Sequence, residues 1–185
     1  MLKKFAAALL ALLGWKAFEA PGRPPKAVMI AFPHTSNWDA FYALLVKIAL
    51  GLDAHWAGKD NMFRPPFGGL LKRMGGVPVN RRERTGFVEQ MVAEFASRER
   101  FTLVIAPEGT RGLTGGWKSG FYRMALAAQV PVALGFMDYA RREGGILAYL
   151  TLTGDRDADL AAIAQLYADR PGKRPELASP IRWLD

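Results

Sequence analysis

The sequence predicts a single α/β domain, a mixed sheet flanked by helices and preceded by an N-terminal apolar helix. Three observations support this fold class. The chain has 185 residues, the usual size of one domain. Short apolar runs alternate with stretches of helical periodicity, as they do in sheets whose faces are covered by helices. No internal repeat or low-complexity tract suggests another architecture.

The elements follow one another along the whole chain. The short apolar runs that predict strands are 27–32, 54–57, 77–80, 102–106, 130–136 and 146–153. The longer stretches that predict helices are 38–50, 67–73, 85–100, 119–129 and 157–168. Because the last residues are rich in proline and carry no second apolar pattern, we expect them to form an irregular tail. The expected division is an N-terminal segment over 1–20, a domain over 26–170 and a tail over 171–185.

The first 20 residues predict a helix that lies on a membrane surface. Lys3 and Lys4 precede an uncharged run, Phe5 to Trp15, that is shorter than the about 20 apolar residues needed to span a bilayer. One side of such a helix, roughly a third of its circumference, would carry Leu2, Phe5, Leu9, Leu12 and Leu13. The lysines could then meet anionic lipid headgroups. Two alternatives stay open, a first helix that packs on the domain and a secretory signal.

Composition narrows the classes of partner and chemistry. Lys and Arg number 25 against 17 Asp and Glu, a formal charge of +8, which favours nucleic acid, an anionic membrane or phosphorylated small molecules as partners. The absence of cysteine excludes disulfides, cysteine-ligated zinc and a thiolate nucleophile. With only His34 and His55, a three-histidine metal site is excluded, and we expect no metal. No serine nucleophile elbow, phosphate loop or dinucleotide loop occurs.

The loop after the first domain strand carries residues suited to acid–base chemistry. Residues 32–39 read FPHTSNWD. If His34 lies in the loop and Asp39 in the first helical turn, the chain can fold back and pair them. The carboxylate would fix the imidazole tautomer and leave the other ring nitrogen free to take a proton from a hydroxyl. Ser36 and Asp39 also fit an N-terminal capping box, so both interpretations stay open.

A second polar segment follows the strand expected over 102–106. Residues 107–111 read PEGTR, in which Gly109 permits a tight bend and Arg111 offers a planar fork suited to phosphate. Lys118 precedes a helix whose first amides could also face an anion. The strand expected over 77–80 likewise ends in arginines. As alternatives to an anion site, residues 107–111 could form a solvated turn, and the arginines after 77–80 could form a basic edge of the surface.

Together these segments resemble the glycerolipid or lysophospholipid acyltransferases, the family of the bacterial 1-acyl-glycerol-3-phosphate acyltransferases. The family's His-x4-Asp block corresponds to His34 and Asp39, and its Glu-Gly-Thr-Arg block to 108–111. A glycine-led strand ending in arginine matches 76–81, and a strand opening with Val-Pro matches 130–134. The departures from the family pattern, Pro33, Pro78 and Asn80, leave the acceptor open.

The resemblance implies an O-acyltransferase of phospholipid biosynthesis. It would move a fatty acyl group from acyl-CoA or acyl-carrier protein to the hydroxyl of a lysophospholipid-type acceptor such as 1-acyl-glycerol-3-phosphate. His34 would be the general base, Asp39 its orienting partner, and the hydroxyl would attack the thioester directly. The implied substrate-binding residues are Arg81 and Arg111 for the acceptor phosphate, Glu108, Gly109 and Thr110 around it, and Lys118 for an anionic group of donor or acceptor. No cofactor is implied beyond the thioester co-substrate.

The expected partners are an anionic membrane surface, the acyl thioester donor with or without its carrier protein, and a phosphorylated lipid acceptor. The expected location is the cytoplasmic face of the inner or plasma membrane, as a peripheral or monotopic protein. We expect no nucleic-acid partner, because no helix-turn-helix, RNP, KH or zinc-finger pattern occurs. Glycerol phosphate, a lyso-ornithine lipid, another lysophospholipid or a lipid A precursor remain alternative acceptors. A non-catalytic basic protein that binds membrane or nucleic acid is the remaining alternative.

Overall fold

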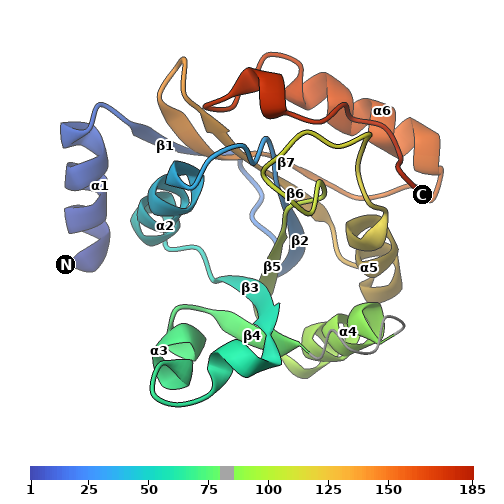
Figure 1. Ribbon diagram of the computed structural model, residues 1–185, viewed down its shortest axis with the longest axis horizontal. Helices are drawn as coiled ribbons and strands as arrows, with labels where there is room; N and C mark the ends of the chain where they lie inside the picture. The colour runs from blue at the N-terminus through green and yellow to red at the C-terminus, as the bar shows by residue number, and fades with distance from the viewer. Residues whose placement is uncertain (80–85) are drawn as a thin grey trace.

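A mixed β-sheet forms the centre of the protein. The computed structural model describes residues 1–79 and 86–185, and in these ranges the sheet has seven strands in the order β1-β7-β6-β2-β5-β3-β4 (Figure 1). The strands are β1 (Lys16–Glu19), β2 (Lys26–Ala31), β3 (Ala54–Lys59), β4 (Gly76–Val79), β5 (Phe101–Ile105), β6 (Val132–Asp138) and β7 (Glu143–Leu150). Among the described pairs, only β6 and β7 run antiparallel. The predicted fold class, a single α/β domain with a mixed sheet, is confirmed.

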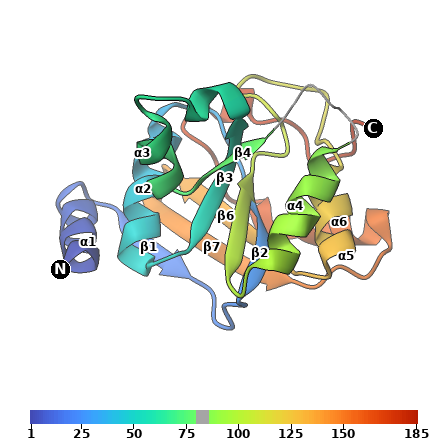
Figure 2. The same ribbon diagram turned by 90° about the horizontal axis from the view of Figure 1, so that it is seen from below.

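Helices cover both faces of the sheet. They are α1 (Leu2–Leu12), α2 (Trp38–Leu50), α3 (Gly68–Arg73), α4 (Phe87–Ser97), α5 (Gly120–Ala128) and α6 (Arg156–Tyr167), with short 3-10 helices η1 (Asp60–Phe63) and η2 (Pro175–Leu177). Helices α1 and α2 lie on one side, whereas α4, α5 and α6 lie on the other (Figures 1 and 2). The sequence predicted α2 to α6 to within a few residues.

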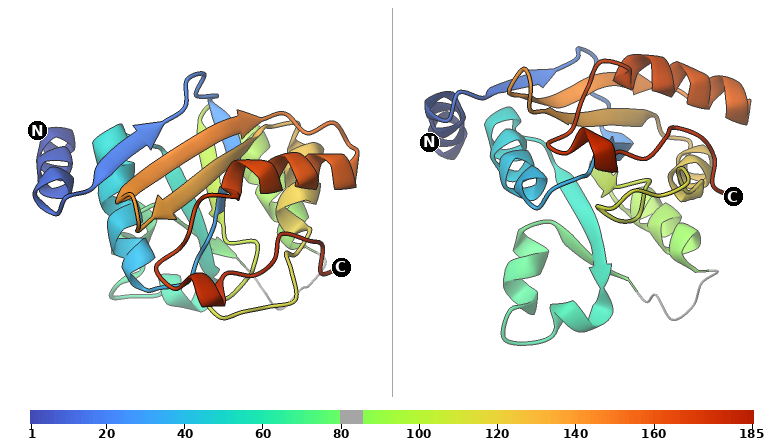
Figure 3. Two further views of the ribbon diagram at one scale, coloured as in Figure 1. Left: turned by 90° about the horizontal axis from the view of Figure 1, so that it is seen from above. Right: turned by 45° about the horizontal axis from the view of Figure 1, so that its top comes forward.

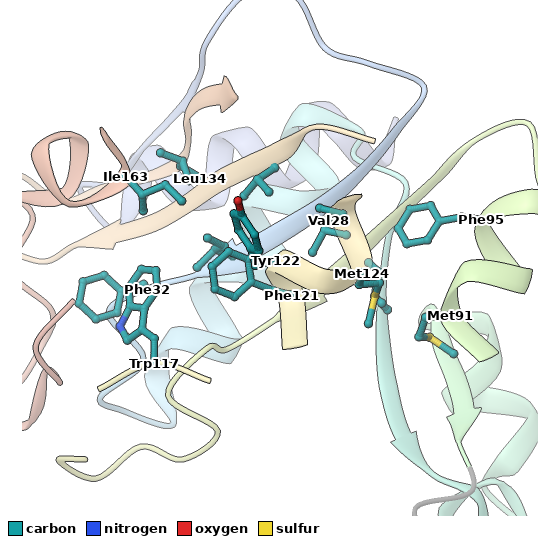
Figure 4. Packing of buried hydrophobic residues seen from close by; sticks show 14 of the residues in the cluster. Val28, Phe32, Met91, Phe95, Trp117, Phe121, Tyr122, Met124, Leu134 and Ile163 are labelled. Atoms are coloured by element: carbon teal, nitrogen blue, oxygen red, sulfur yellow. The ribbon is translucent and has the colours of Figure 1, made fainter. Parts of the chain in front are cut away.

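The larger hydrophobic core lies between the sheet and the α4–α6 side. Phe121 and Met124 of α5 and Ile163 of α6 are fully buried there against Val28 and Leu134 of the central strands (Figure 4). A smaller cluster on the opposite face joins α1, α2 and β1. Side chains of the central strands are therefore buried on both faces, as expected for parallel strands with near-continuous apolar runs.

The N-terminal segment is helical for only part of the predicted length. Helix α1 ends at Leu12, and Lys16–Glu19 form strand β1 beside β7, so the expectation of one helix over 1–20 was wrong. Gly14 adopts φ +74°, which ends the helix and turns the chain toward the sheet. Trp15 then packs on Tyr42 with ring centroids 4.1 Å apart. Within the described residues, no helix combines the length and apolar character needed to cross a bilayer.

The C-terminal residues expected to form a tail pack along the domain (Figure 3). Gly172 and Ser179 are buried, and the backbone of Trp183 bridges to Trp117. The segment lacks regular structure apart from η2, which fits its proline content. It nevertheless belongs to the domain, because it covers the ends of loops from the central strands.

Three neighbouring strands deliver the polar loops to one edge of the sheet. Strand β2 lies between β5 and β6 and is parallel to both, with Ile30 opposite Ile105 and Leu134. Since parallel strands end at the same edge, the loops that follow β2, β5 and β6 emerge side by side. This edge holds both motif segments that the sequence singled out, at His34 and Glu108.

Candidate active site

His34 and Asp39 pair at the carboxyl edge of the sheet. His34 lies in the loop after β2 and Asp39 in the first turn of α2, and His34 Nδ1 is 3.2 Å from Asp39 Oδ2. The His34 side chain is 22% exposed, and among the described residues its Nε2 has no hydrogen-bond partner. An imidazole oriented through Nδ1, with Nε2 left without a partner in the described chain, is the arrangement that a general base requires.

The same carboxylate also holds the loop. Asp39 Oδ2 accepts hydrogen bonds of 2.9 Å from the backbone N–H groups of both Thr35 and Ser36. Ser36 Oγ in turn accepts from the N–H of Trp38 at 3.2 Å. The capping-box interpretation and the pairing with His34 are therefore compatible, because one oxygen serves both.

Tyr139, in the loop after β6, binds the second carboxylate oxygen. Its hydroxyl donates to Asp39 Oδ1 at 2.7 Å. Burial of Asp39 raises the pKa of its carboxyl, but hydrogen bonds from His34, Tyr139 and the Ser36 N–H outweigh this and hold the pKa below its ordinary value. Burial and the bond to Asp39 raise the pKa of Tyr139. Asp39 is thus kept as a carboxylate facing the His34 ring.

Glu108 is buried and joins three segments of the chain. It is 1% exposed, and its two oxygens accept from the N–H of His34 at 3.0 Å and from the N–H of Ser179 at 2.9 Å. With both oxygens bound to backbone amides, the side chain positions the histidine loop. The sequence expected Glu108 to shape the acceptor site, and this contact gives it an indirect way to do so.

The next residues of the motif are exposed. Gly109 adopts φ +71°, a conformation that favours glycine, and turns the chain after Glu108. Thr110 Oγ1 accepts from the N–H of Gly112 at 3.3 Å. Arg111 and Lys118 are exposed, and neither side chain forms an ion pair with any described residue. Both are therefore available to an anion.

A carboxylate of the chain itself lies at the start of α5. The N–H of Ser119, the N-cap residue, donates to Asp185 Oδ1 at 2.9 Å, and its hydroxyl donates to Oδ2 at 3.1 Å. That the amides of the first helical turn face a bound anion stays a prediction. Arg81, expected to hold phosphate, lies outside the described residues.

A cavity of about 400 Å³ opens beside the loop that carries His34, although His34 itself is not among the lining residues. Its lining consists of residues 35–38, Arg111, Gly112, Arg174 and Leu177. This volume is in the range of small-molecule sites. The lining contains guanidinium groups from two separate segments and no carboxylate. The cavity is therefore suited to an anionic group held close to the histidine.

Comparison with known proteins decides the family. A family model described as Acyltransferase matches residues 21–133, more than half of the chain. The chain belongs to the acyltransferase family. Among solved structures, this acyltransferase is similar to the 1-acyl-sn-glycerophosphate (LPA) acyltransferase PlsC from Thermotoga maritima, with a TM-score of 0.58 and 14% identity. The match covers 93% of this chain and 80% of that one, and at this identity it shows a shared fold. Comparison with curated proteins gave no match.

The structure adds to the acyltransferase site two residues that sequence reasoning missed. Tyr139 follows a buried strand at the same edge of the sheet as His34, so the rule that polar residues after strands form sites could have found it. Arg174 has no comparable signal, because the segment around it is irregular and its position depends on how the C-terminus packs.

Proposed function

We propose that this acyltransferase moves a fatty acyl group from a thioester of coenzyme A or acyl-carrier protein to the hydroxyl of a lysophospholipid, 1-acyl-glycerol-3-phosphate being the acceptor that best fits. The observation that carries the proposal is the oriented His34–Asp39 pair beside a cavity whose charged side chains are arginines. The pair supplies a base for a hydroxyl, and the arginines supply a phosphate site next to it. The name of the similar solved structure agrees with this acceptor.

The reaction follows from the free ring nitrogen. His34 Nε2 takes the hydroxyl proton as the acceptor oxygen attacks the thioester carbonyl, and Asp39 stabilises the imidazolium that forms. The tetrahedral intermediate then collapses, the carbon–sulfur bond breaks, and the imidazolium returns the proton to the leaving thiolate. The products are an ester and a free thiol. Because the chain has no cysteine and no serine elbow, direct attack fits its residues without a covalent acyl-enzyme.

Arg111 is the motif residue that we assign to the acceptor phosphate. It is exposed, lines the cavity and forms no ion pair with a described residue. A guanidinium can bind two phosphate oxygens at once, which fixes orientation as well as charge. Fixing the phosphate holds the acceptor hydroxyl near His34, and such positioning supplies much of the catalysis in reactions of two substrates.

Helix α1 and its surroundings suit the surface of an anionic membrane. Exposed apolar side chains lie on α1, α2 and the region of α3, namely Leu2, Phe5, Leu12, Leu13, Trp38, Phe41, Leu44, Met62, Phe67, Leu70 and Met74. Buried Ala6 and Leu10 face α2, so one flank of α1 packs while another stays exposed. A protein of charge +8 that binds lipid substrates gains from such contact, because it meets them in the bilayer surface.

The decisive test replaces the base. His34→Gln should lower turnover with acyl-CoA and 1-acyl-glycerol-3-phosphate by about 10²–10⁴-fold, while circular dichroism should show that the variant is folded. His55→Gln is the matched control, because His55 Nε2 also lies near an aspartate, 3.7 Å from Asp53 Oδ1, but His55 is at the start of β3, away from the edge where the loops after β2 and β5 emerge. Normal acyl transfer by His34→Gln would overturn the assignment of the base. A panel of lyso-lipid acceptors, read by mass spectrometry, would identify the acceptor.

A further inference from the structure

The C-terminal segment forms one wall of the cavity beside His34. The N–H of Arg174 donates to Thr35 Oγ1 at 3.2 Å, and Thr35 is the residue next to the proposed base. Further along, Ser179 binds Glu108 through its N–H and Thr114 through its hydroxyl. In Figure 3, η2 lies between the loop that follows β2 and the loop that follows β5. The segment is therefore fixed against both motif loops.

This contact is close enough to define the position of Arg174. A Cβ atom on Gly172 would lie 2.8 Å from Thr35 Oγ1 and 3.1 Å from Pro33 Cβ, so only glycine allows the segment to approach the histidine loop this closely. Gly172 itself is buried. The close contact at Gly172 and the hydrogen bond from the Arg174 N–H to Thr35 therefore fix the backbone of Arg174 beside the histidine loop.

The side chain of Arg174 is exposed and available. It lines the cavity together with Arg111, and neither guanidinium forms a hydrogen bond or ion pair with any residue in the described ranges. Other arginines of the C-terminal part do have partners. Arg170 Nη1 lies 3.4 Å from Asp138 Oδ2, and Arg182 Nε donates to the carbonyl of Gly115 at 2.6 Å. Two unpaired like charges at one cavity are unfavourable unless an anion lies between or beside them.

We propose that Arg174 is a substrate-binding residue that, together with Arg111, holds the phosphate monoester of the acceptor. The inference rests on the proposed function and deepens it, because it adds a residue outside the region that matches the family model, residues 21–133. Arg111 approaches the phosphate from the loop after β5 and Arg174 from the C-terminal segment. A phosphate monoester has enough oxygens for both forks, whereas an uncharged headgroup does not.

The test compares acceptors with and without phosphate. In Arg174→Gln the KM for 1-acyl-glycerol-3-phosphate should rise about 10- to 100-fold, the loss expected for one charge-assisted contact. The KM for acyl-CoA and the rate with monoacylglycerol should stay unchanged, and Arg174→Lys should recover part of the loss. The matched control is Arg123→Gln, an exposed arginine of α5 that does not line the cavity.

A binding measurement separates this inference from the reaction itself. Titration of the protein with glycerol 3-phosphate, followed by the chemical shifts of residues 35–38, should show binding that Arg174→Gln weakens, and glycerol should not bind. If the protein transfers acyl groups but Arg174→Gln leaves the KM for the phosphorylated acceptor unchanged, the inference fails and the proposed function stands. If no acceptor is acylated while Arg174-dependent binding persists, the proposed function fails and the phosphate site stands. Circular dichroism of each variant checks that it is folded.

Discussion

Asp39 shows how much of the site depends on one buried carboxylate. Its Oδ2 faces His34 and two backbone N–H groups of the same loop, and its Oδ1 faces Tyr139. A buried charge is tolerated only when its lone pairs accept hydrogen bonds, and both oxygens of Asp39 accept hydrogen bonds from groups of the protein. The same contacts that satisfy the charge also orient the imidazole, so stability and catalysis depend on one residue.

Removing the Tyr139 hydroxyl tests whether its hydrogen bond stabilises the buried Asp39 carboxylate. In Tyr139→Phe the pKa of Asp39 should rise toward its ordinary value, and the free energy of unfolding near neutral pH should fall by about 1.5–3 kcal/mol, the usual contribution of a hydrogen bond to a charged group. The pKa of Asp39 is lowered in the folded protein, so its contribution is present above the unfolded pKa and is lost as the pH falls through the folded pKa. Urea unfolding should therefore show a gap between wild type and variant that narrows as the solution is acidified.

A control separates the hydroxyl from the ring. Tyr42 packs on Trp15 and neighbours Tyr139, with ring centroids 6.0 Å apart, but does not bind Asp39. Tyr42→Phe should therefore leave the dependence of unfolding on pH as it is in the wild type. Lys173, whose Nζ lies 5.8 Å from the centroid of the Tyr139 ring, is also charged, and it is the same in both variants. A pH-independent gap for Tyr139→Phe would contradict the role given to its hydroxyl.

At the scale of elements, the site is a junction of loops held by Glu108. The loop after β2, the loop after β5 and the C-terminal segment meet at this one side chain. Each segment is mostly irregular, although Phe32, Trp117 and Trp183 anchor them on the main core. Backbone N–H groups bound to a buried carboxyl give the junction directional contacts that apolar packing does not provide.

Glu108→Gln should loosen this junction. A glutamine can accept with one oxygen only, so the N–H of either His34 or Ser179 would face an NH₂ group, and the free energy of unfolding should fall by about 1–3 kcal/mol. Hydrogen exchange of the amides of His34 and Ser179 should quicken. The exposed Glu99 provides the control, because Glu99→Gln should change neither measurement. Unchanged exchange at both amides in Glu108→Gln would show that the junction does not depend on this side chain.

At the scale of the whole molecule, exposed apolar side chains gather on the α1, α2 and α3 side. The opposite side, with α4 to α6, closes over the main core and exposes fewer large apolar residues, such as Leu126 and Leu166. Contiguous exposed apolar surface is unusual for a protein that remains in water. The asymmetry gives the proposed membrane contact a definite side of the molecule.

Binding to vesicles tests that side. Phe5→Ser should weaken sedimentation with phosphatidylglycerol-containing vesicles, because Phe5 is 65% exposed on the free flank of α1. Leu166→Ser is the matched control, 40% exposed on α6. Added salt should weaken binding of the wild type, since the charge of +8 contributes to it. Equal binding by Phe5→Ser and wild type would exclude α1 from the contact.

Much of the fold could be predicted because its signals are local. The sequence pattern that predicts each of helices α2 to α6 and each apolar strand lies within one short stretch of the chain, and His34 and Asp39 also lie in one short segment. Strand β1 was missed because it has four residues and is a strand only through its pairing with β7. Tyr139 was missed because it is 100 residues from Asp39, the partner that gives it a role.

The sequence by itself determined the α/β class, the order of the elements other than β1, the family and the pair His34–Asp39, because short-range apolar patterns and a six-residue segment carry that information. Only the tertiary structure decided that the C-terminal segment forms a wall of the cavity, that Asp185 binds Ser119 at the start of α5, and that Tyr139 binds Asp39 while Arg174 lines the cavity. Those contacts join residues far apart in the chain. They exist only once the sheet has brought the ends of β2, β5 and β6 to one edge.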